Sequence, residues 1–417
     1  MRVLLLSWSD HMGGAARAAS RLHQALRASG VESELIVAAK VGHDAHVHAP
    51  RTRFQRLAVR VAGRWDRLPL RAYPERRAGL FTPAIARAGT PQRAAAMPRD
   101  ITHLHWVANG FMRIEDLQKL SGPLVWSLHD LWPLTGGCHY SEGCERYTEQ
   151  CGRCPVLGSD DDEDLSRQVW LRKRAAWNKP NLTLIASSRW MAGIVRSSSL
   201  FRERRIEIVP NCVDTELFRP ADRAAARTVF SLPQDRAVVL FGALTASGDR
   251  RKGFHLLTPA LERLAQRVPR ESVCLAVMGL SRPEGPTPLP FDAHYLGVIQ
   301  DDARLALAYA AADLLVVPSL EDNLPYMVME AMSCATPCVA FDVSGLPDLI
   351  EHGVTGYLAR PFEVDDLTRG LESLVTNQQH RTSLGMRSRQ AVLDRFAPRV
   401  IARRHLDLYE DLLRAAR

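Results

Sequence analysis

The stretch that decides the fold runs Pro318-Ser-Leu-Glu-Asp-Asn-Leu-Pro-Tyr-Met-Val-Met-Glu330-Ala-Met332. It follows an uninterrupted apolar run, Leu314–Val317, of the kind that a parallel sheet buries on both faces. Asp322 then lies in the loop at the carboxyl end of a predicted strand, where open α/β sheets bind ligands. Glu330 falls in the first half of the helix that follows, so we expect both carboxylates to face one crevice. Carboxylates accept strong hydrogen bonds from sugar hydroxyls, so the pair predicts a polyhydroxylated ligand.

Length and composition indicate a globular protein of several domains. The 417 residues exceed one ordinary core, so two or three domains are expected. The apolar share of 46% and the charged share of 24% are typical of soluble proteins. No apolar run approaches the roughly 18–20 residues of a membrane helix. The opening Met-Arg-Val-Leu-Leu-Leu-Ser segment is too short for a signal peptide, so we predict a cytoplasmic protein.

Strand candidates alternate with helix-length segments, and this pattern restarts once along the chain. The candidates are Val3–Ser7, Ser33–Val37, Ile101–Trp106, Leu124–Leu128 and Leu182–Ala186 in the first half, and Ala237–Phe241, Val273–Met278, Leu314–Val317 and Cys338–Phe341 in the second. Such alternation predicts two doubly wound α/β domains with parallel sheets and right-handed crossovers. We place the domains at residues 1–214 and 215–396, followed by a charged amphipathic helix at 397–417.

Several segments together resemble the retaining glycosyltransferases of family four, which have the two-domain GT-B architecture. Asp322 and Glu330 match the acid-x7-acid signature of that family, although its members normally carry Glu at the first position. The flanking segments agree with it as well: Ala312-Asp313-Leu-Leu-Val-Val-Pro-Ser, Cys334-Ala-Thr-Pro-Cys-Val-Ala and Ser344-Gly-Leu-Pro-Asp348. The resemblance implies two Rossmann-like domains that face a cleft, and a last helix that crosses back onto the first domain. For the acid pair alone, a surface loop with two solvated acids is the competing interpretation.

A basic turn after the first strand of the second half resembles the diphosphate clamp of this family. A departing nucleoside diphosphate carries extra negative charge, which cations must stabilise. Lys252, followed by a glycine, matches the clamp best. Relatives carry Arg at the position of Ala243, so Arg250 or Arg251 would supply the second cation, and we favour Arg251. A solvated basic turn is the alternative.

The resemblance also implies which residues contact the donor and how the reaction proceeds. Asp322 would contact the hydroxyls of the transferred sugar, and Glu330 the ribose of the nucleotide. Further donor contacts are implied at Gly242, Leu296, Val298, Asn323, Leu324 and Pro325, the last of which has no N–H to donate. The anomeric configuration would be retained, with the leaving phosphate taking the proton of the acceptor. No protein nucleophile and no metal-binding motif for the diphosphate is evident, so we expect no cofactor for catalysis.

Two features of the first half complete the predicted site. Gly13 and Gly14 follow the first strand and precede a helix, where backbone amides can approach an anion closely. By resemblance this loop approaches the donor diphosphate or the acceptor. His129 follows another strand and by resemblance contacts the donor sugar, whereas a structural hydrogen-bonding role is the alternative. His103 and His105 receive no role, and we expect one of them to face the core.

Four of the eight cysteines cluster as Cys138-x5-Cys144-x6-Cys151-x2-Cys154. In a cytoplasmic protein this spacing favours a metal site over disulfides, and four thiolates suit a structural, tetrahedral Zn²⁺. Free thiols and disulfides stay open as alternatives. The cluster and its surroundings, from Trp132 to Pro155, also resemble a subset of exopolysaccharide glycosyltransferases in which residues 138–154 form an insertion.

The positive charge of the chain concentrates between Arg51 and Asp100, where twelve arginines face three acids. Apolar residues recur there at helical spacing, and arginines form a second stripe beside them, until Pro69 ends the pattern. The apolar stripe contains Phe54, Leu57, Ala58, Val61, Trp65 and Leu68, and the arginine stripe Arg53, Arg56, Arg60, Arg64, Arg67 and Arg71. This pattern suits a helix on an anionic membrane surface or one that captures a diphosphate-bearing lipid. An ordinary helix packed on the core is the alternative. No nucleic-acid recognition motif accompanies the charge.

The sequence therefore predicts a retaining hexosyltransferase. The donor would be a GDP- or UDP-linked sugar, and the acceptor a polyprenyl-diphosphate-linked glycan at the inner face of the plasma membrane. Two other classes stay open: a sugar-nucleotide epimerase or hydrolase of the same fold, and a non-catalytic module that binds sugar nucleotides.

Overall fold

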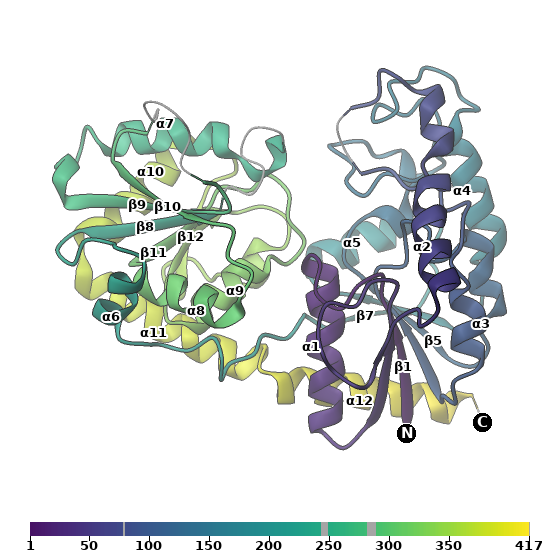
Figure 1. Ribbon diagram of the computed structural model, residues 1–417. Helices are drawn as coiled ribbons and strands as arrows, with labels where there is room; N and C mark the ends of the chain where they lie inside the picture. The colour runs from purple at the N-terminus through teal and green to yellow at the C-terminus, as the bar shows by residue number, and fades with distance from the viewer. Residues whose placement is uncertain (78–79, 243–248, 282–288, 417) are drawn as a thin grey trace. The chain divides into compact units, whose positions relative to one another are not determined.

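The computed structural model describes residues 1–77, 80–242, 249–281 and 289–416, and this part of the chain forms two compact units. Met1–Asn211 and Ile401–Arg417 form the N-terminal unit, and Cys212–Val400 forms the C-terminal unit. Each unit is built on one parallel sheet (Figure 1). The predicted fold, two Rossmann-like α/β domains with a C-terminal helix, is confirmed.

The N-terminal unit contains a seven-stranded parallel sheet in the order β3-β2-β1-β4-β5-β6-β7. Its strands are β1 (Arg2–Leu6), β2 (Glu32–Ile36), β3 (Val47–His48), β4 (Ile101–Leu104), β5 (Leu124–Leu128), β6 (Leu182–Ala186) and β7 (Ile206–Ile208). Its helices are α1 (Gly14–Ala28), α2 (Arg53–Trp65), α3 (Thr90–Ala95), α4 (Leu165–Ala176) and α5 (Arg189–Ser197), with short 3-10 turns η1 (Leu68–Ala72), η2 (Ile114–Lys119), η3 (Trp132–Leu134) and η4 (Arg146–Thr148). Strands β4, β5 and β6 are buried along their whole length, as expected for inner strands of a parallel sheet that is covered on both faces.

The last helix, α12 (Pro398–Ala415), packs on the N-terminal unit from Ile401 onward. Its buried stripe recurs at helical spacing and contains Ile401, Ala402, His405, Leu408 and Tyr409. The Tyr409 hydroxyl lies 2.6 Å from Nδ1 of His103 on β4. A guanidinium nitrogen of Arg404 donates to the carbonyl of Ile208 on β7. The amphipathic tail therefore completes the core of the unit that begins the chain.

The C-terminal unit contains a six-stranded parallel sheet in the order β10-β9-β8-β11-β12-β13. Its strands are β8 (Ala237–Gly242), β9 (Val273–Met278), β10 (Asp292–Gly297), β11 (Leu314–Val317), β12 (Cys338–Phe341) and β13 (Gly356–Ala359). Its helices are α6 (Arg223–Val229), α7 (Phe254–Leu264), α8 (Asp302–Ala311), α9 (Tyr326–Ser333), α10 (Val364–Thr376) and α11 (Gln378–Arg395), with 3-10 turns η5 (Arg250–Lys252), η6 (Arg270–Ser272) and η7 (Leu346–Asp348). Alternate residues of β8 enter two different cores, one against α7 and α10 and the other against α6, α8, α9 and α11.

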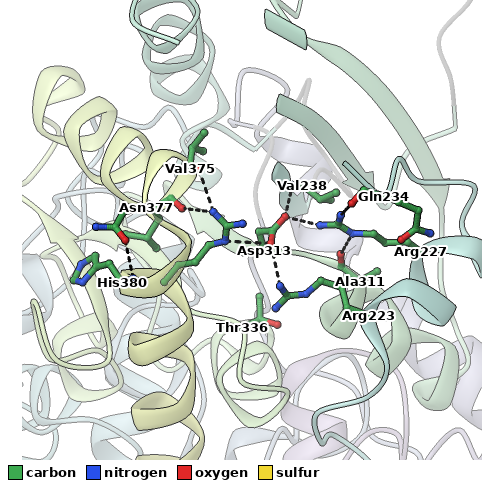
Figure 2. A network of polar contacts seen from close by, with 12 residues as sticks. Arg223, Arg227, Gln234, Val238, Ala311, Asp313, Thr336, Val375, Asn377 and His380 are labelled. Carbon is green, nitrogen blue, oxygen red and sulfur yellow. Dashed lines mark hydrogen bonds and ion pairs between the residues drawn. The ribbon is translucent and has the colours of Figure 1, made fainter. Parts of the chain in front are cut away.

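An ion cluster holds the amino ends of the central strands of this unit (Figure 2). Asp313, directly before β11, is 2% exposed and accepts a 2.7 Å hydrogen bond from the backbone N–H of Val238 on β8. Three arginines surround its carboxylate: Arg227 at 2.5 Å, Arg223 at 3.1 Å and Arg381 at 3.2 Å. These come from α6 and α11, so one buried acid connects two helices to the sheet.

The observed elements differ from the predicted ones mainly at the edges of the sheets. Strands β3, β7, β10 and β13 have no counterpart among the predicted strands. The predicted strand Ile101–Trp106 ends at Leu104. The domain boundaries predicted after residues 214 and 396 compare with unit boundaries after residues 211 and 400. None of the helices among the described residues combines the length and apolar character needed to cross a bilayer.

Candidate active site

The predicted donor residues gather at the point where the strand order of the C-terminal sheet reverses. From β8 the chain adds β9 and β10 on one side, and then returns to place β11 on the other side of β8. The loops after β8 and β11 therefore leave neighbouring strands at the same edge of the sheet. Open α/β sheets bind ligands at such a switch point.

The two loops touch through their backbones. Gly253 has a φ of +69°, and a Cβ atom there would lie 1.7 Å from the carbonyl oxygen of Pro318. The backbone N–H of Leu320 donates a 2.7 Å hydrogen bond to the carbonyl of Arg251. Only glycine fits at position 253, because a side chain would collide with the neighbouring loop. This contact fixes the place of Lys252 against the acidic loop.

Lys252 and Asp322 form an ion pair at the crossing of these loops. The ammonium nitrogen lies 2.7 Å from a carboxylate oxygen of Asp322, and both side chains are partly exposed. The backbone carbonyl of Asp322 accepts a 3.0 Å hydrogen bond from the N–H of Gly345, in the loop after β12. The ends of three neighbouring strands, β8, β11 and β12, thus hold one cation beside one acid. The roles of Lys252 toward a diphosphate and of Asp322 toward a sugar stay predictions.

The other predicted cations lie in the same turn. Arg251 pairs with Asp249 at 2.6 Å, and the Asp249 side chain also accepts the backbone N–H of Arg251. Arg250 begins the 3-10 turn η5 and is exposed. Ala243, directly after Gly242, lies outside the described residues. The choice of Arg251 over Arg250 as second cation stays a prediction.

Of the two signature acids, only Asp322 is open to solvent. Glu330 is 2% exposed on α9, and one of its carboxylate oxygens accepts a 3.0 Å hydrogen bond from the hydroxyl of Tyr309 on α8. Glu330 is thus buried while Asp322 is partly exposed, and the expectation that both carboxylates face one crevice stays a prediction. A ribose reaches Glu330 only if neighbouring side chains move, so its role stays a prediction.

The remaining predicted donor contacts surround the same sheet edge. A Cβ on Gly242 would lie 2.9 Å from the methyl group of Met327, so the end of β8 meets the first turn of α9. Leu324 is buried, and the carbonyl of Pro325 caps α9 by accepting from Val328. The other three predicted donor contacts are Asn323 in the same loop, and Leu296 and Val298 at the end of edge strand β10.

In the N-terminal unit, Gly13 immediately precedes α1 and has a φ of +90°. Space around it is open, since a Cβ there would meet nothing within 4 Å. Asp10, earlier in the same loop, accepts hydrogen bonds from the backbone N–H groups of Val41 and Gly42 at 2.8 and 2.9 Å. The strand order also reverses here, between β1 and β4. The loop with Gly13 and Gly14 is therefore at a second switch point.

His129 belongs to a row of stacked histidines that the sequence did not reveal. Its Nε2 lies 2.9 Å from Nδ1 of His105, and His105 stacks on His103 with ring centroids 4.5 Å apart. Burial lowers the pKa of His129 to about 4, an effect that Asp130 only partly offsets, so its imidazole is neutral at neutral pH. The expectation that one of His103 and His105 faces the core is wrong. Both are buried, because β4 lies inside the sheet and is covered on both faces.

Two family profiles match the chain, one in each half. The profile described as Glycosyltransferase Family 4 matches residues 12–217, and the one described as Glycosyl transferases group 1 matches residues 235–377. The chain belongs to the family 4, group 1 glycosyltransferases. His129 lies within the first match, and Lys252 and Asp322 lie within the second.

Curated relatives of this glycosyltransferase cover most of the chain at modest identity. The D-inositol 3-phosphate glycosyltransferase of Gordonia bronchialis is 27% identical over 376 residues, which is 86% of this chain and 76% of that protein. The protein of the same name from Nocardia farcinica is 26% identical over 74% of this chain and 65% of its own length. These relatives do not narrow the chain to the exopolysaccharide subset.

Solved structures with the same fold match nearly the whole glycosyltransferase chain. Sucrose-phosphate synthase from Thermosynechococcus elongatus superposes with a TM-score of 0.67 at 20% identity, over 99% of both chains. Anabaena HepE in complex with UDP and glucose superposes with a TM-score of 0.62 at 17% identity, over 98% of this chain and 99% of that one. At these identities the likeness shows the fold alone, GT-B.

Beside the histidine row, the glycosyltransferase buries a second polar group that the sequence did not reveal. Asp130 lies 2.7 Å from Nδ1 of His139 and accepts a 2.9 Å hydrogen bond from the indole N–H of Trp106. The Nε2 of His139 lies 2.9 Å from the hydroxyl of Thr82. His139 therefore belongs to this group rather than to the cysteine cluster beside it in sequence.

The four clustered cysteines line one small cavity of about 20 Å³. All eight cysteines are free, and Cys151 accepts a 3.0 Å hydrogen bond from the N–H of Gly136. Burial raises the pKa of the Cys151 thiol to about 12 and also raises that of Cys138. Within the described residues, no three His, Cys, Asp or Glu side chains surround a point closely enough to hold a metal. Structural zinc at Cys138, Cys144, Cys151 and Cys154 stays a prediction.

Proposed function

We propose that this chain transfers a hexose from a nucleoside diphosphate sugar to a glycan acceptor. The observation that carries the proposal is the Lys252–Asp322 pair, 2.7 Å apart, at the switch point of the C-terminal sheet. Such a site offers a cation for a diphosphate and a carboxylate for sugar hydroxyls within one contact distance. The match of both halves to glycosyltransferase profiles supports it.

The reaction requires a short set of bond changes. The bond between the sugar C1 and the β-phosphate oxygen breaks, and a bond forms between C1 and the acceptor oxygen on the same face of the ring. The acceptor proton passes to the departing phosphate, so the configuration at C1 is retained without a protein nucleophile. Lys252 stabilises the charge that develops on the phosphate, and Asp322 orients the hydroxyls of the sugar.

The identity of the donor and acceptor is inferred from chemistry and from named relatives. Anabaena HepE was solved with UDP and with UDP-glucose, which favours UDP over GDP as the donor nucleotide here. The curated relatives are named for a phosphate-bearing acceptor, D-inositol 3-phosphate. A polyprenyl-diphosphate-linked glycan, the acceptor predicted from the sequence, shares the phosphate group, and we keep it as the proposed acceptor class.

Thermal unfolding with a panel of nucleotides and nucleotide sugars tests donor binding. A ligand at 100 times its Kd adds about 2.7 kcal/mol of stability, so a UDP- or GDP-selective rise in the melting temperature is expected. Product analysis with lipid-linked acceptors then tests transfer. Steady hydrolysis or epimerisation of the donor without acceptor would instead identify an epimerase or hydrolase. Binding without any turnover would identify a non-catalytic module.

Structural zinc at the four cysteines is proposed separately, with its own test. Four thiols line one cavity, with Cys151 and Cys154 buried and Cys138 and Cys144 partly buried. Such a set suits a tetrahedral ion, which would hold together the segment between β5 and α4. Purified protein should carry one zinc per chain, and Cys151→Ser should lower this ratio. Cys274→Ser, at a buried cysteine of the other unit, is the control. Absence of zinc together with four titratable thiols would contradict the proposal.

A further inference from the structure

Helix α2 turns a stripe of large apolar side chains toward solvent. Its start is fixed by a capping box, in which Thr52 accepts the backbone N–H of Gln55. Only Ala62 of the helix is buried, and Val59 beside it packs on the core. Phe54 is 84% exposed and Trp65 62% exposed. The exposed stripe, from the helix into η1, contains Phe54, Leu57, Val61, Trp65 and Leu68.

This exposure decides between the two interpretations of the arginine-rich segment. A helix that packed its apolar stripe on the core would bury these five side chains, so that alternative is wrong. The core-facing side is instead the narrow one formed by Val59, Ala62 and Asp66. Asp66 is buried and accepts backbone hydrogen bonds from Ile85 and Ala86. A contiguous exposed apolar stripe of this kind marks a surface that binds something.

The arginines of the helix line a groove next to the stripe. A cavity of about 810 Å³ lies between α2 and the loop after β2, with Arg56, Arg60, Arg64, Arg67 and Lys40 among its lining residues. In the described part of the chain, none of these four guanidinium groups pairs with an acid. Arg56 reaches the carbonyl of Pro50 at 3.4 Å, and Arg67 the side chain of Asn109 at 3.3 Å.

A row of unpaired arginines around one cavity favours an anion. Like charges four residues apart on a helix repel one another, and a bound anion removes that repulsion. Guanidinium groups match phosphate oxygens in pairs, which makes phosphate the best-fitting anion. Since the apolar stripe adjoins the arginine row on the same helix, the partner has to present phosphate and hydrocarbon side by side. A phospholipid surface has this layout.

We propose that α2 lies on an anionic phospholipid bilayer. Its apolar stripe enters the acyl layer, and the groove lined by Arg56, Arg60 and Arg64 receives lipid phosphates. This bilayer contact does not depend on catalysis. One consequence rests on the proposed function: the contact would hold the enzyme at the layer in which a lipid-linked acceptor lies.

Flotation of the full chain with phospholipid vesicles tests the proposal. We expect binding to vesicles of phosphatidylglycerol mixed with phosphatidylcholine, much weaker binding to phosphatidylcholine alone, and weakening by salt. Arg56→Gln, Arg60→Gln and Arg64→Gln together should reduce the affinity by about 100-fold, since each basic residue near such a surface contributes roughly five-fold. Phe54→Ser with Trp65→Ser should reduce it at least ten-fold.

Two matched control variants distinguish vesicle binding by the α2 face from nonspecific electrostatic or hydrophobic binding. Arg263, Arg267 and Arg369 each pair with an acid in the C-terminal unit, so their joint change to Gln removes the same charge elsewhere. Phe362→Ser with Met386→Ser removes two exposed apolar side chains of that unit. Both control variants should bind vesicles like the wild type.

Three results would overturn the proposal. The first is that the wild type does not bind anionic vesicles at low salt. The second is that the control variants lose as much vesicle binding as the α2 variants. The third is that the wild type forms a dimer in solution and the Phe54→Ser, Trp65→Ser variant is a monomer. Thermal stabilisation by the nucleotide sugar is measured on the same variants, so that failure of vesicle binding can be distinguished from failure of donor binding. Vesicle binding without donor binding would leave the bilayer contact standing while the transferase proposal fails.

Discussion

Arginines serve opposite purposes in the two units of this protein. In the C-terminal unit, Arg223, Arg227 and Arg381 converge on the buried carboxylate of Asp313 (Figure 2). In the N-terminal unit, Arg56, Arg60 and Arg64 of α2 line an open groove and have no acid partner among the described residues. The first arrangement connects helices to a sheet, and the second leaves a positive surface available for a partner.

The role of an arginine in these two units depends on its partner rather than on its charge. A buried acid with several arginines contributes to folding, because removing it leaves charges without compensation inside the protein. An exposed row of arginines contributes nothing to folding and repels itself, so its value lies in binding. The Lys252–Asp322 pair is intermediate, since its partly exposed cation can exchange an acid for the phosphate of a ligand.

The largest effect is expected at the buried acid. Asp313→Ala should lower the free energy of unfolding by about 3–5 kcal/mol, because it leaves the nearly buried Arg227 and Arg381 without their counter-charge. Asp365→Ala, which removes the exposed partner of Arg263, is the matched control and should cost at most about 1 kcal/mol. Urea unfolding of both variants checks this. Equal losses would mean that burial of the acid is irrelevant.

The histidines of the N-terminal unit extend the comparison, because a histidine can lose its charge where an arginine cannot. Burial lowers the pKa of His405 and of His129 to about 4, and it lowers that of His103 as well. The unfolded chain binds these protons below about 6.5, so unfolding takes up protons between pH 6.5 and 4. Stability should be complete above pH 6.5 and fall with pH in that window, by up to about 3 kcal/mol for His405 alone.

Melting temperatures measured across this pH range check the prediction, and His405→Gln provides the comparison. The variant should be less stable at pH 7 but show a shallower loss toward pH 4. A wild-type melting temperature that stays level between pH 6.5 and 4 would show that these imidazoles are accessible to protons in the folded protein.

Substitution of Lys252 in the Lys252–Asp322 ion pair is expected to affect catalysis rather than folding. Lys252→Ala should lower kcat by about 10²-fold, because the departing diphosphate loses a cation that acts in the transition state. Its melting temperature should change little, since the ion pair with Asp322 is partly exposed. Arg263→Ala, in the same unit, should keep full activity. A fully active Lys252→Ala enzyme would place the diphosphate elsewhere.

The smallest effect on stability is expected at α2. Changing Arg56, Arg60 and Arg64 to Gln together should alter the free energy of unfolding by less than about 0.5 kcal/mol, because the side chains are exposed and pair with no acid among the described residues. Relief of like-charge repulsion makes a small gain the expected sign. A loss as large as that of Asp313→Ala would remove the contrast between the two arginine groups.

Edge strands account for most of what the sequence did not predict about the sheets. Strands β5, β6, β9, β11 and β12 begin and end where the sequence predicted, because an inner parallel strand is buried on both faces and is rich in apolar residues. Strand β10 (Asp292–Gly297) lies at an edge, is only partly buried and contains Asp292 and His294, so it lacks an apolar run. Strand β3 has only two residues. Their pairing depends on the neighbouring strand rather than on their own composition.

The candidate site likewise has a part that could be predicted from the sequence and a part that could not. The loops after β8 and β11 could be predicted from the sequence because strand-loop-helix motifs are local, and the family resemblance pointed to Lys252 and Asp322 within them. It did not reveal the row of His103, His105 and His129, since that row forms only when β4 and β5 lie side by side. Nor did it show that Tyr309 would cover Glu330, a contact between two helices.

Tertiary structure alone decided which face of each of the two amphipathic helices is buried. Both α2 and α12 carry apolar residues at helical spacing beside arginines, and this periodicity states only that one face differs from the other. In α12 the stripe containing Tyr409 is buried against β4, whereas in α2 the stripe containing Phe54 faces solvent. Helical spacing in the sequence shows which side chains share a face of each helix. Which face is buried depended on where the sheet provided an apolar surface to pack against.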